Sequence, residues 1–162
     1  MRVPIQRMVL VVAAVVLFSP AARAQLPRPS LGPQGGFASN HYDAFIGAQI
    51  AFPVTPRVDI YPSLDIYFPG NSTTAWALNA DVRFWPRLQV PNPGLFVGGG
   101  LSYTHASVDV LPFGTVSSSD TVLGLLGGWD FKAVSWRPFV QLRIVIGDAD
   151  RVEFGGGVNF RI

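Results

Sequence analysis

The stretch Val152-Glu153-Phe154-Gly155-Gly156-Gly157-Val158-Asn159-Phe160-Arg161-Ile162 decides the fold of this chain. Every even-numbered residue in it is apolar or glycine, and every odd-numbered residue is polar, charged or glycine. Successive side chains of a β-strand point to opposite faces, so this alternation predicts a strand with one face toward lipid and the other toward a packed polar interior. The stretch is therefore typical of the last strand of a membrane β-barrel.

The same alternation recurs upstream, and clusters of Pro, Gly, Asn and Asp separate the segments that carry it. The expected strands are 30–38, 42–52, 57–68, 74–85, 95–104, 121–131, 136–146 and 152–162. No stretch shows a helical period of apolar residues, which favours an all-β fold. An even number of strands puts both termini on one side of a membrane, and about eight strands enclose a lumen that side chains alone can fill. We therefore expect an eight-stranded antiparallel up-and-down transmembrane β-barrel.

Three prolines, Pro33, Pro62 and Pro138, fall inside expected strands. Proline cannot donate to the hydrogen-bond ladder, and a closed barrel has no free edge on which to place it. We therefore expect Pro62 and Pro138 to lie at a rim or at a bulge.

The first 24 residues have the three parts of a secretory signal peptide. Two arginines precede an apolar run at 8–18, and Ala22-Arg23-Ala24 is a small-residue cleavage site, with cleavage expected before Gln25. The apolar run is shorter than the roughly 20 residues that a membrane-spanning helix needs. The sequence therefore predicts a signal peptide at 1–24 and a single β-barrel domain at 25–162.

The chain has 12 Lys and Arg residues against 10 Asp and Glu residues, and it has no cysteine. Three of the basic residues lie in the predicted signal peptide, so the mature chain is nearly neutral and no nucleic-acid partner is indicated. The lack of cysteine excludes a secreted disulfide scaffold.

A soluble barrel of the lipocalin sort would bury its apolar face around a ligand and expose its charges. In this chain the charges share a face with Gly and Ser, and the large apolar residues on the opposite face are too voluminous to pack inside so small a barrel with a ligand. Aromatic residues of the apolar face gather near the strand ends, like the two girdles of a membrane barrel, which predicts contact with membrane lipid. One set is Phe52, Phe84, Trp129, Phe131, Trp136 and Phe160, and the other is Tyr42, Phe68, Trp76, Tyr103 and Phe154.

Gly157, Phe160 and Ile162 fit a C-terminal signal in which glycine precedes two aromatic or apolar residues separated by one position. The segment 94–103 is similar to a glycine-rich strand of the same proteins. On these elements the chain from 30 to 162 resembles the small eight-stranded outer-membrane proteins of the OmpA/OmpX type of Gram-negative bacteria. The resemblance implies insertion into the cell outer membrane by the barrel-assembly machinery, which reads the C-terminal strand. It also implies a structural, adhesive or surface-protective role without enzymatic activity.

Charged residues fall on the face expected to line the lumen, namely Asp59, Asp65, Asp81, Arg83, Arg143 and Glu153. A buried arginine without a carboxylate is strongly destabilising, so we expect paired charges, with Arg83 facing Asp59 or Tyr61. A three-residue turn at 148–150 would set Arg143 opposite Gly155, with Glu153 as its diagonal neighbour. We interpret these charges as a polar plug that fixes strand register; the alternative is a narrow channel or a barrel that binds a small apolar ligand.

No catalytic residue, cofactor site or metal site is expected. His105-Ala106-Ser107 resembles the His-x-Ser pair of lipid A deacylases, but Val108 replaces the Asn of that family, and only Asp109 is near in sequence to orient the base. A lipid-modifying hydrolase is therefore a distant third hypothesis. The other histidine, His41, is far away in sequence, and two histidines without cysteine do not suggest a metal cluster. The longest expected loop, 105–120, is the best candidate for binding a surface partner.

Overall fold

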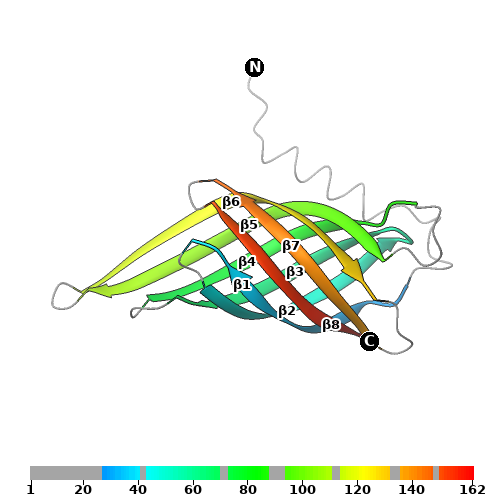
Figure 1. The fold of residues 1–162 in the computed structure, drawn as a ribbon, viewed down its shortest axis with the longest axis horizontal. Coiled ribbons are helices and arrows are strands. Elements are labelled where there is room, and N and C mark those ends of the chain that lie inside the picture. Colours follow the sequence, from blue (N-terminus) through cyan, green and yellow to red (C-terminus); the bar gives the residue numbers. More distant parts are fainter. Residues whose placement is uncertain are drawn as a thin grey trace, which may run out of the picture.

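The structure is a computed structural model that describes residues 27–40, 43–69, 73–87, 94–110, 114–131, 136–147 and 150–162. The described residues form eight strands: β1 (Ser30–Ala38), β2 (Asp43–Thr55), β3 (Val58–Phe68), β4 (Thr73–Phe84), β5 (Leu95–Val110), β6 (Gly114–Asp130), β7 (Trp136–Ile146) and β8 (Arg151–Arg161). Each strand pairs antiparallel with its neighbour in sequence, and β1 also pairs with β8, so the sheet closes into a barrel (Figure 1). The expected all-β barrel is confirmed. The predicted signal peptide at 1–24 lies outside the described residues.

The two ends of the barrel differ. At one end, here called the terminal mouth, β1 begins, β8 ends and β2 connects to β3. At the other end, here called the hairpin mouth, β5 and β6 continue as a hairpin that projects beyond the neighbouring strands (Figure 1).

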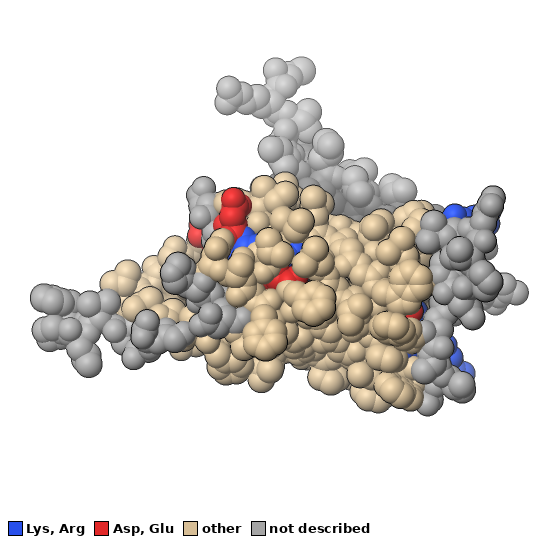
Figure 2. Space-filling view, viewed as in Figure 1, with Lys and Arg blue, Asp and Glu red and all other residues tan. Residues whose placement is uncertain are grey.

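The alternation read from the sequence separates the two faces of the sheet. In β4, Leu78 and Val82 are exposed on the outside, while Asn79 and Asp81 are buried inside. Figure 2 shows the side of the barrel covered mostly by uncharged residues, with several arginine side chains visible at the right-hand end, where the C-terminus lies in Figure 1. Among the described residues, no helix is long and apolar enough to cross a membrane.

Most aromatic residues of the outer face lie toward the two ends of the strands, as expected. Those toward the terminal mouth are Phe52, Phe84, Trp129, Phe131, Trp136 and Phe160. Those toward the hairpin mouth are Phe68, Trp76 and Phe154, whereas Tyr103 lies in the middle of β5 because that strand extends to Val110. Tyr42 lies outside the described residues.

The expected long loop at 105–120 is wrong, because most of it is strand. β5 has 16 residues and β6 has 17, and their pairing is continuous from Leu95 opposite Trp129 to Val110 opposite Gly114. The Ser, Thr and Val residues of this segment favour extended backbone, and Gly114 supplies a positive φ of 97° beside the connection. Sequence composition alone made the segment resemble a loop because it lacks a clear apolar face.

Pairing of the strands is interrupted near the prolines. The ladder between β2 and β3 lapses at Pro62, and that between β1 and β8 lapses at Pro33. Pro138 lies just beyond the last pair of β6 with β7. Pro62 therefore lies in mid-strand, where the ladder is interrupted, and not at a rim or a bulge as expected. Proline has no N–H to donate, and at an interruption of the ladder no donor is required.

The register of the last hairpin also differs from expectation. Arg143 lies opposite Glu153, and not opposite Gly155. The side chain of Asp150 accepts a hydrogen bond from the backbone N–H of Gly147 at 2.8 Å, which closes a loop longer than the three residues assumed. Pairing consequently starts only at Val145, opposite Arg151.

Candidate functional site

The candidate site is the lumen, where the inward positions of the strands bring polar side chains together. The charged residues Asp59, Asp65, Asp81, Arg83, Arg143 and Glu153 are all buried there, as the alternation predicted. Because a closed barrel offers these groups no route to bulk water across its wall, each must find a partner inside.

The group nearest the terminal mouth is centred on Arg83. Its guanidinium donates to Asp59 through Nε at 3.1 Å and Nη2 at 2.9 Å, a two-point pairing between β4 and β3. The guanidinium carbon lies 3.5 Å from the centroid of the Tyr61 ring and 5.1 Å from the rings of Trp85 and Phe96. Arg83 is only 2% exposed and Tyr61 is fully buried, so these side chains, here called the Arg83 layer, are shielded from solvent inside the barrel. The expected pairing of Arg83 with Asp59 is confirmed.

The middle of the lumen holds ion pairs that cross the barrel. Arg143 of β7 pairs with Asp81 of β4, although these strands are not adjacent. Glu153, the register partner of Arg143, lies 4.0 Å from its Nε. Glu153 also accepts hydrogen bonds from Arg151 Nε and from the Tyr67 hydroxyl, both at 2.6 Å.

A hydrogen-bonded network around Asp65 lies beside these pairs. Asp65 accepts hydrogen bonds from Gln34 at 2.5 Å and from Asn79 at 2.7 Å, and Asn79 also donates to Ser63 at 3.0 Å. Strands β1, β3, β4, β7 and β8 all contribute side chains to these ion pairs and hydrogen bonds. Such a network can fix the register of strands across the lumen.

Sequence reasoning missed three members of this lumen. Arg151 was not recognised as inward, although it shares the odd parity of Glu153, because the strand was taken to begin at Val152. The pair of Asp130 with Arg137 was also missed; Arg137 donates to it through Nε at 3.1 Å and Nη2 at 2.6 Å. Arg137 and Arg151 both have the odd numbering of the inward residues of their strands, and this could have identified them as lumen residues.

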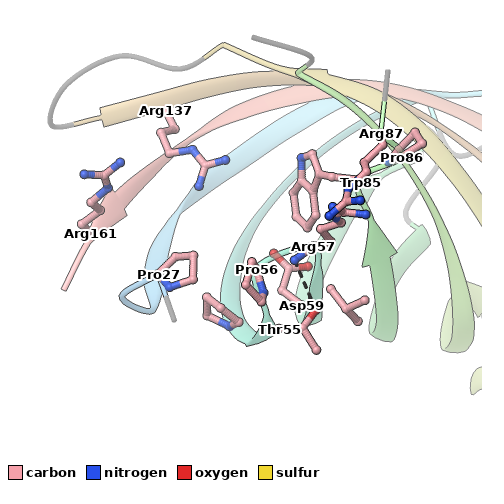
Figure 3. Close-up of a pocket in the computed structure, with 12 residues that line it drawn as sticks. Pro27, Thr55, Pro56, Arg57, Asp59, Trp85, Pro86, Arg87, Arg137 and Arg161 are labelled. Carbon is pink, nitrogen blue, oxygen red and sulfur yellow. Dashed lines mark hydrogen bonds between the residues drawn. The ribbon is translucent and has the colours of Figure 1, made fainter. Parts of the chain in front are cut away.

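A cavity of about 440 Å³ opens at the terminal mouth, next to the Arg83 layer (Figure 3). Its wall includes Asp59 and Trp85, four prolines and four arginines. A second cavity of about 250 Å³ lies at the hairpin mouth, lined by residues of β7 and β8 and by Asn40.

The histidine of the His-x-Ser pattern lies on the outer face of the projecting hairpin. His105 Nδ1 is 2.8 Å from Ser119 Oγ, its cross-strand neighbour, and its ring packs against that of Trp76. Ser107 instead donates weakly to the backbone oxygen of Thr74, at 3.5 Å. The structure does not bring His105 and Ser107 together as a hydrogen-bonded pair in the part of the chain that it describes.

The described residues contain no group of three or more His, Cys, Asp and Glu side chains that could hold a metal ion. His41 and the side chain of Asp109 lie outside the described part.

No family model matches the sequence, and no curated protein matches it either. Solved structures do match the fold. The N-terminal β-barrel domain of Pseudomonas aeruginosa OprF superposes with a TM-score of 0.63 at 15% identity, covering 85% of this chain and all of that one. Neisserial surface protein A gives a TM-score of 0.61 at 12% identity over 83% of this chain and 96% of its own.

Ail, the attachment invasion locus protein of Yersinia pestis, gives a TM-score of 0.54 at 14% identity, with 83% of this chain and 97% of that chain covered. These neighbours are eight-stranded outer-membrane β-barrels, and this chain has the same fold. The resemblance read from the sequence is confirmed at the level of fold.

Proposed function

We propose that this chain is a non-enzymatic protein of the bacterial outer membrane, with a structural or surface-interaction role and a lumen plugged by polar and charged side chains. The single observation that carries the proposal is the layer formed by Arg83, Asp59 and Tyr61, backed by the cross-barrel pair of Arg143 with Asp81. All five of these side chains are buried.

The plug favours a closed barrel over a narrow channel. An ion moving along the lumen would have to displace arginines that are held by carboxylates in a low-dielectric interior, which is strongly unfavourable. The polar character of the same lining disfavours a barrel that carries a small apolar ligand, because such a ligand would leave the lining groups without partners.

The projecting hairpin is the proposed surface-interaction element. β7 pairs with β6 only up to Leu123, so the β6 backbone from Gly114 to Val122 has no described strand on that edge. Exposed side chains here are small and polar, apart from Val116. An unpaired edge can accept an extended segment of another protein by adding a strand to the sheet, with main-chain hydrogen bonds supplying the affinity.

The proposed orientation puts the terminal mouth in the periplasm and the hairpin outside the cell. Short turns on the periplasmic side and longer excursions outside are usual for such barrels. The exposed apolar side chains of Phe160 and Ile162 then lie at the end of the strand that the barrel-assembly machinery would read. In this orientation the exposed apolar side chains on the outside of the barrel face outer-membrane lipid.

The first test is cell fractionation combined with SDS gels of boiled and unboiled protein. Heat-modifiable migration and partition with the outer membrane are expected, and a soluble protein without a mobility shift would refute the membrane proposal. Purified protein in planar bilayers should then show no stable conductance steps. Regular steps would refute the plug and favour the narrow channel.

A matched pair of variants tests the surface role. Replacing residues 107–117 by a short Gly-Ser turn removes the tip of the projecting hairpin, including Gly114 to Ser117 of the unpaired edge, and leaves β5 and β6 paired from Ala106 opposite Ser118 downward. Cells displaying the intact protein should adhere to host cells or matrix more than cells displaying the shortened one. Equal adhesion at equal surface abundance would refute the role of the hairpin.

A further inference from the structure

The terminal mouth carries an unusual concentration of positive charge. Four arginines line its cavity, namely Arg57, Arg87, Arg137 and Arg161, against a single lining carboxylate, Asp59. They come from the β2–β3 turn, the segment after β4, the start of β7 and the end of β8. Figure 3 shows Arg137 and Arg161 on one side of the cavity and Arg87 with Trp85 on the other.

Arg161 continues the inward row of β8, because it follows the buried Asn159 by two residues. Residues two apart in a strand share a face. Arg57, in the turn before β3, and Arg87, after the end of β4, line the same cavity. The arginines therefore extend from the lumen-facing side of the barrel wall into the mouth, and not from the side that faces lipid.

The two described side-chain carboxylates nearest this cavity, Asp59 and Asp130, are already engaged. Asp59 takes the two-point contact from Arg83, and Asp130 takes the two-point contact from Arg137. Within the described part of the chain, Arg57, Arg87 and Arg161 form no ion pair. Three cations thus surround one cavity without a neutralising carboxylate, and their fields add in the space between them.

We propose that the terminal mouth is a binding site for a small molecule that carries a phosphate group. The planar guanidinium fork matches the oxygens of a phosphate, and a phosphate with up to two charges suits several arginines better than a carboxylate with one. A cavity of about 440 Å³ is large enough for a small organic molecule. Trp85 and the four prolines of the cavity wall provide a rigid surface against which the apolar part of such a ligand can pack.

A phospholipid headgroup presents the same phosphate chemistry as a soluble ligand. The position of the arginines around the cavity favours the soluble ligand, because a headgroup in the bilayer would approach from the outer face of the strands. The site lies on the other side of the Arg83 layer from the rest of the lumen, so it needs no passage through the barrel.

The test is isothermal titration calorimetry of the folded protein in dodecyl maltoside, with adenosine 5′-monophosphate as probe and adenosine as its uncharged control. The double variant Arg57→Gln with Arg161→Gln removes two arginines that hold no ion pair. Arg28→Gln is the matched control, since Arg28 is exposed, precedes β1 at the same end and does not line the cavity. Heat-modifiable migration verifies that every variant is folded.

The expected result is that the monophosphate binds and adenosine does not, that the double variant weakens binding at least about tenfold, and that Arg28→Gln changes it less than about twofold. Absence of monophosphate binding, or equal losses in the double variant and in Arg28→Gln, would overturn the site. A parallel titration with dihexanoyl phosphatidylglycerol separates the sources. Arginine-dependent binding of that lipid alone would overturn the assignment to a soluble ligand.

Discussion

Replacing Arg83 by methionine should destabilise the barrel more than any exposed substitution of similar size. Arg83 is 2% exposed and Asp59 is 5% exposed, so neither charge can be hydrated when its partner is removed. Removing one partner of a buried ion pair costs about 3–5 kcal/mol, because the other charge stays buried alone. Loss of the guanidinium from the face of the Tyr61 ring, 3.5 Å away, acts in the same direction.

The double variant Asp59→Asn with Arg83→Met gives the sharper expectation. It leaves no buried charge at this layer, and replacing a whole buried pair is often close to neutral. The double variant should therefore be more stable than either single variant, which requires a coupling free energy of at least about 3–5 kcal/mol, the size of one single loss. Arg28→Gln, on an exposed side chain, should stay within about 0.5 kcal/mol of the wild type.

The assay is urea unfolding and refolding in phosphatidylcholine vesicles, followed by tryptophan fluorescence and by the fraction of heat-modifiable protein. Transitions must coincide between the two probes before free energies are compared. A loss below about 1 kcal/mol for Arg83→Met, or single losses that simply add in the double variant, would refute the reasoning that the pair is desolvated and coupled.

Three further predictions follow from the same structure. Gly100 and Gly124 face each other across β5 and β6, yet a Cβ at Gly100 would lie 2.0 Å from a backbone oxygen of β4, whereas the nearest atom to a Cβ at Gly124 is 3.9 Å away. Gly100→Ala should thus lower the free energy of unfolding by about 1–3 kcal/mol, and Gly124→Ala should lower it by less than about 1 kcal/mol. Equal unfolding midpoints for the two variants would contradict the close approach of Gly100 to the β4 backbone. Arg143→Ala leaves Asp81 buried without its partner, so the urea midpoint should fall while bilayer recordings stay silent; new conductance steps would show that this arginine blocks an ion path. N-terminal sequencing of the protein from outer membranes should begin at Gln25, and a start at Met1 would disprove the signal peptide.

Much of the fold could be predicted because its signals are local. Strands β1 and β7 have the predicted bounds, and the inward charges were assigned correctly from parity alone. The pairing of Arg83 with Asp59 was predictable for the same reason, since the two residues lie on consecutive strands joined by a short turn. The predictions that proved wrong concern segments without a clear alternation of apolar and polar residues. These are the Ser- and Thr-rich segment of β5 and β6 and the turn before Arg151.

The sequence by itself determined the all-β class, the lipid-facing and lumen-facing sides, and the eight-stranded count, because the period of two and the turn residues act within a few positions of the chain. Only the tertiary structure decided which distant groups meet. Arg143 reaches Asp81 across the barrel, and four arginines from separate segments of the chain line one mouth. These contacts depend on the closure and the stagger of the sheet, which place residues of non-adjacent strands at the same level along the barrel axis. The register of a single hairpin does not specify that level.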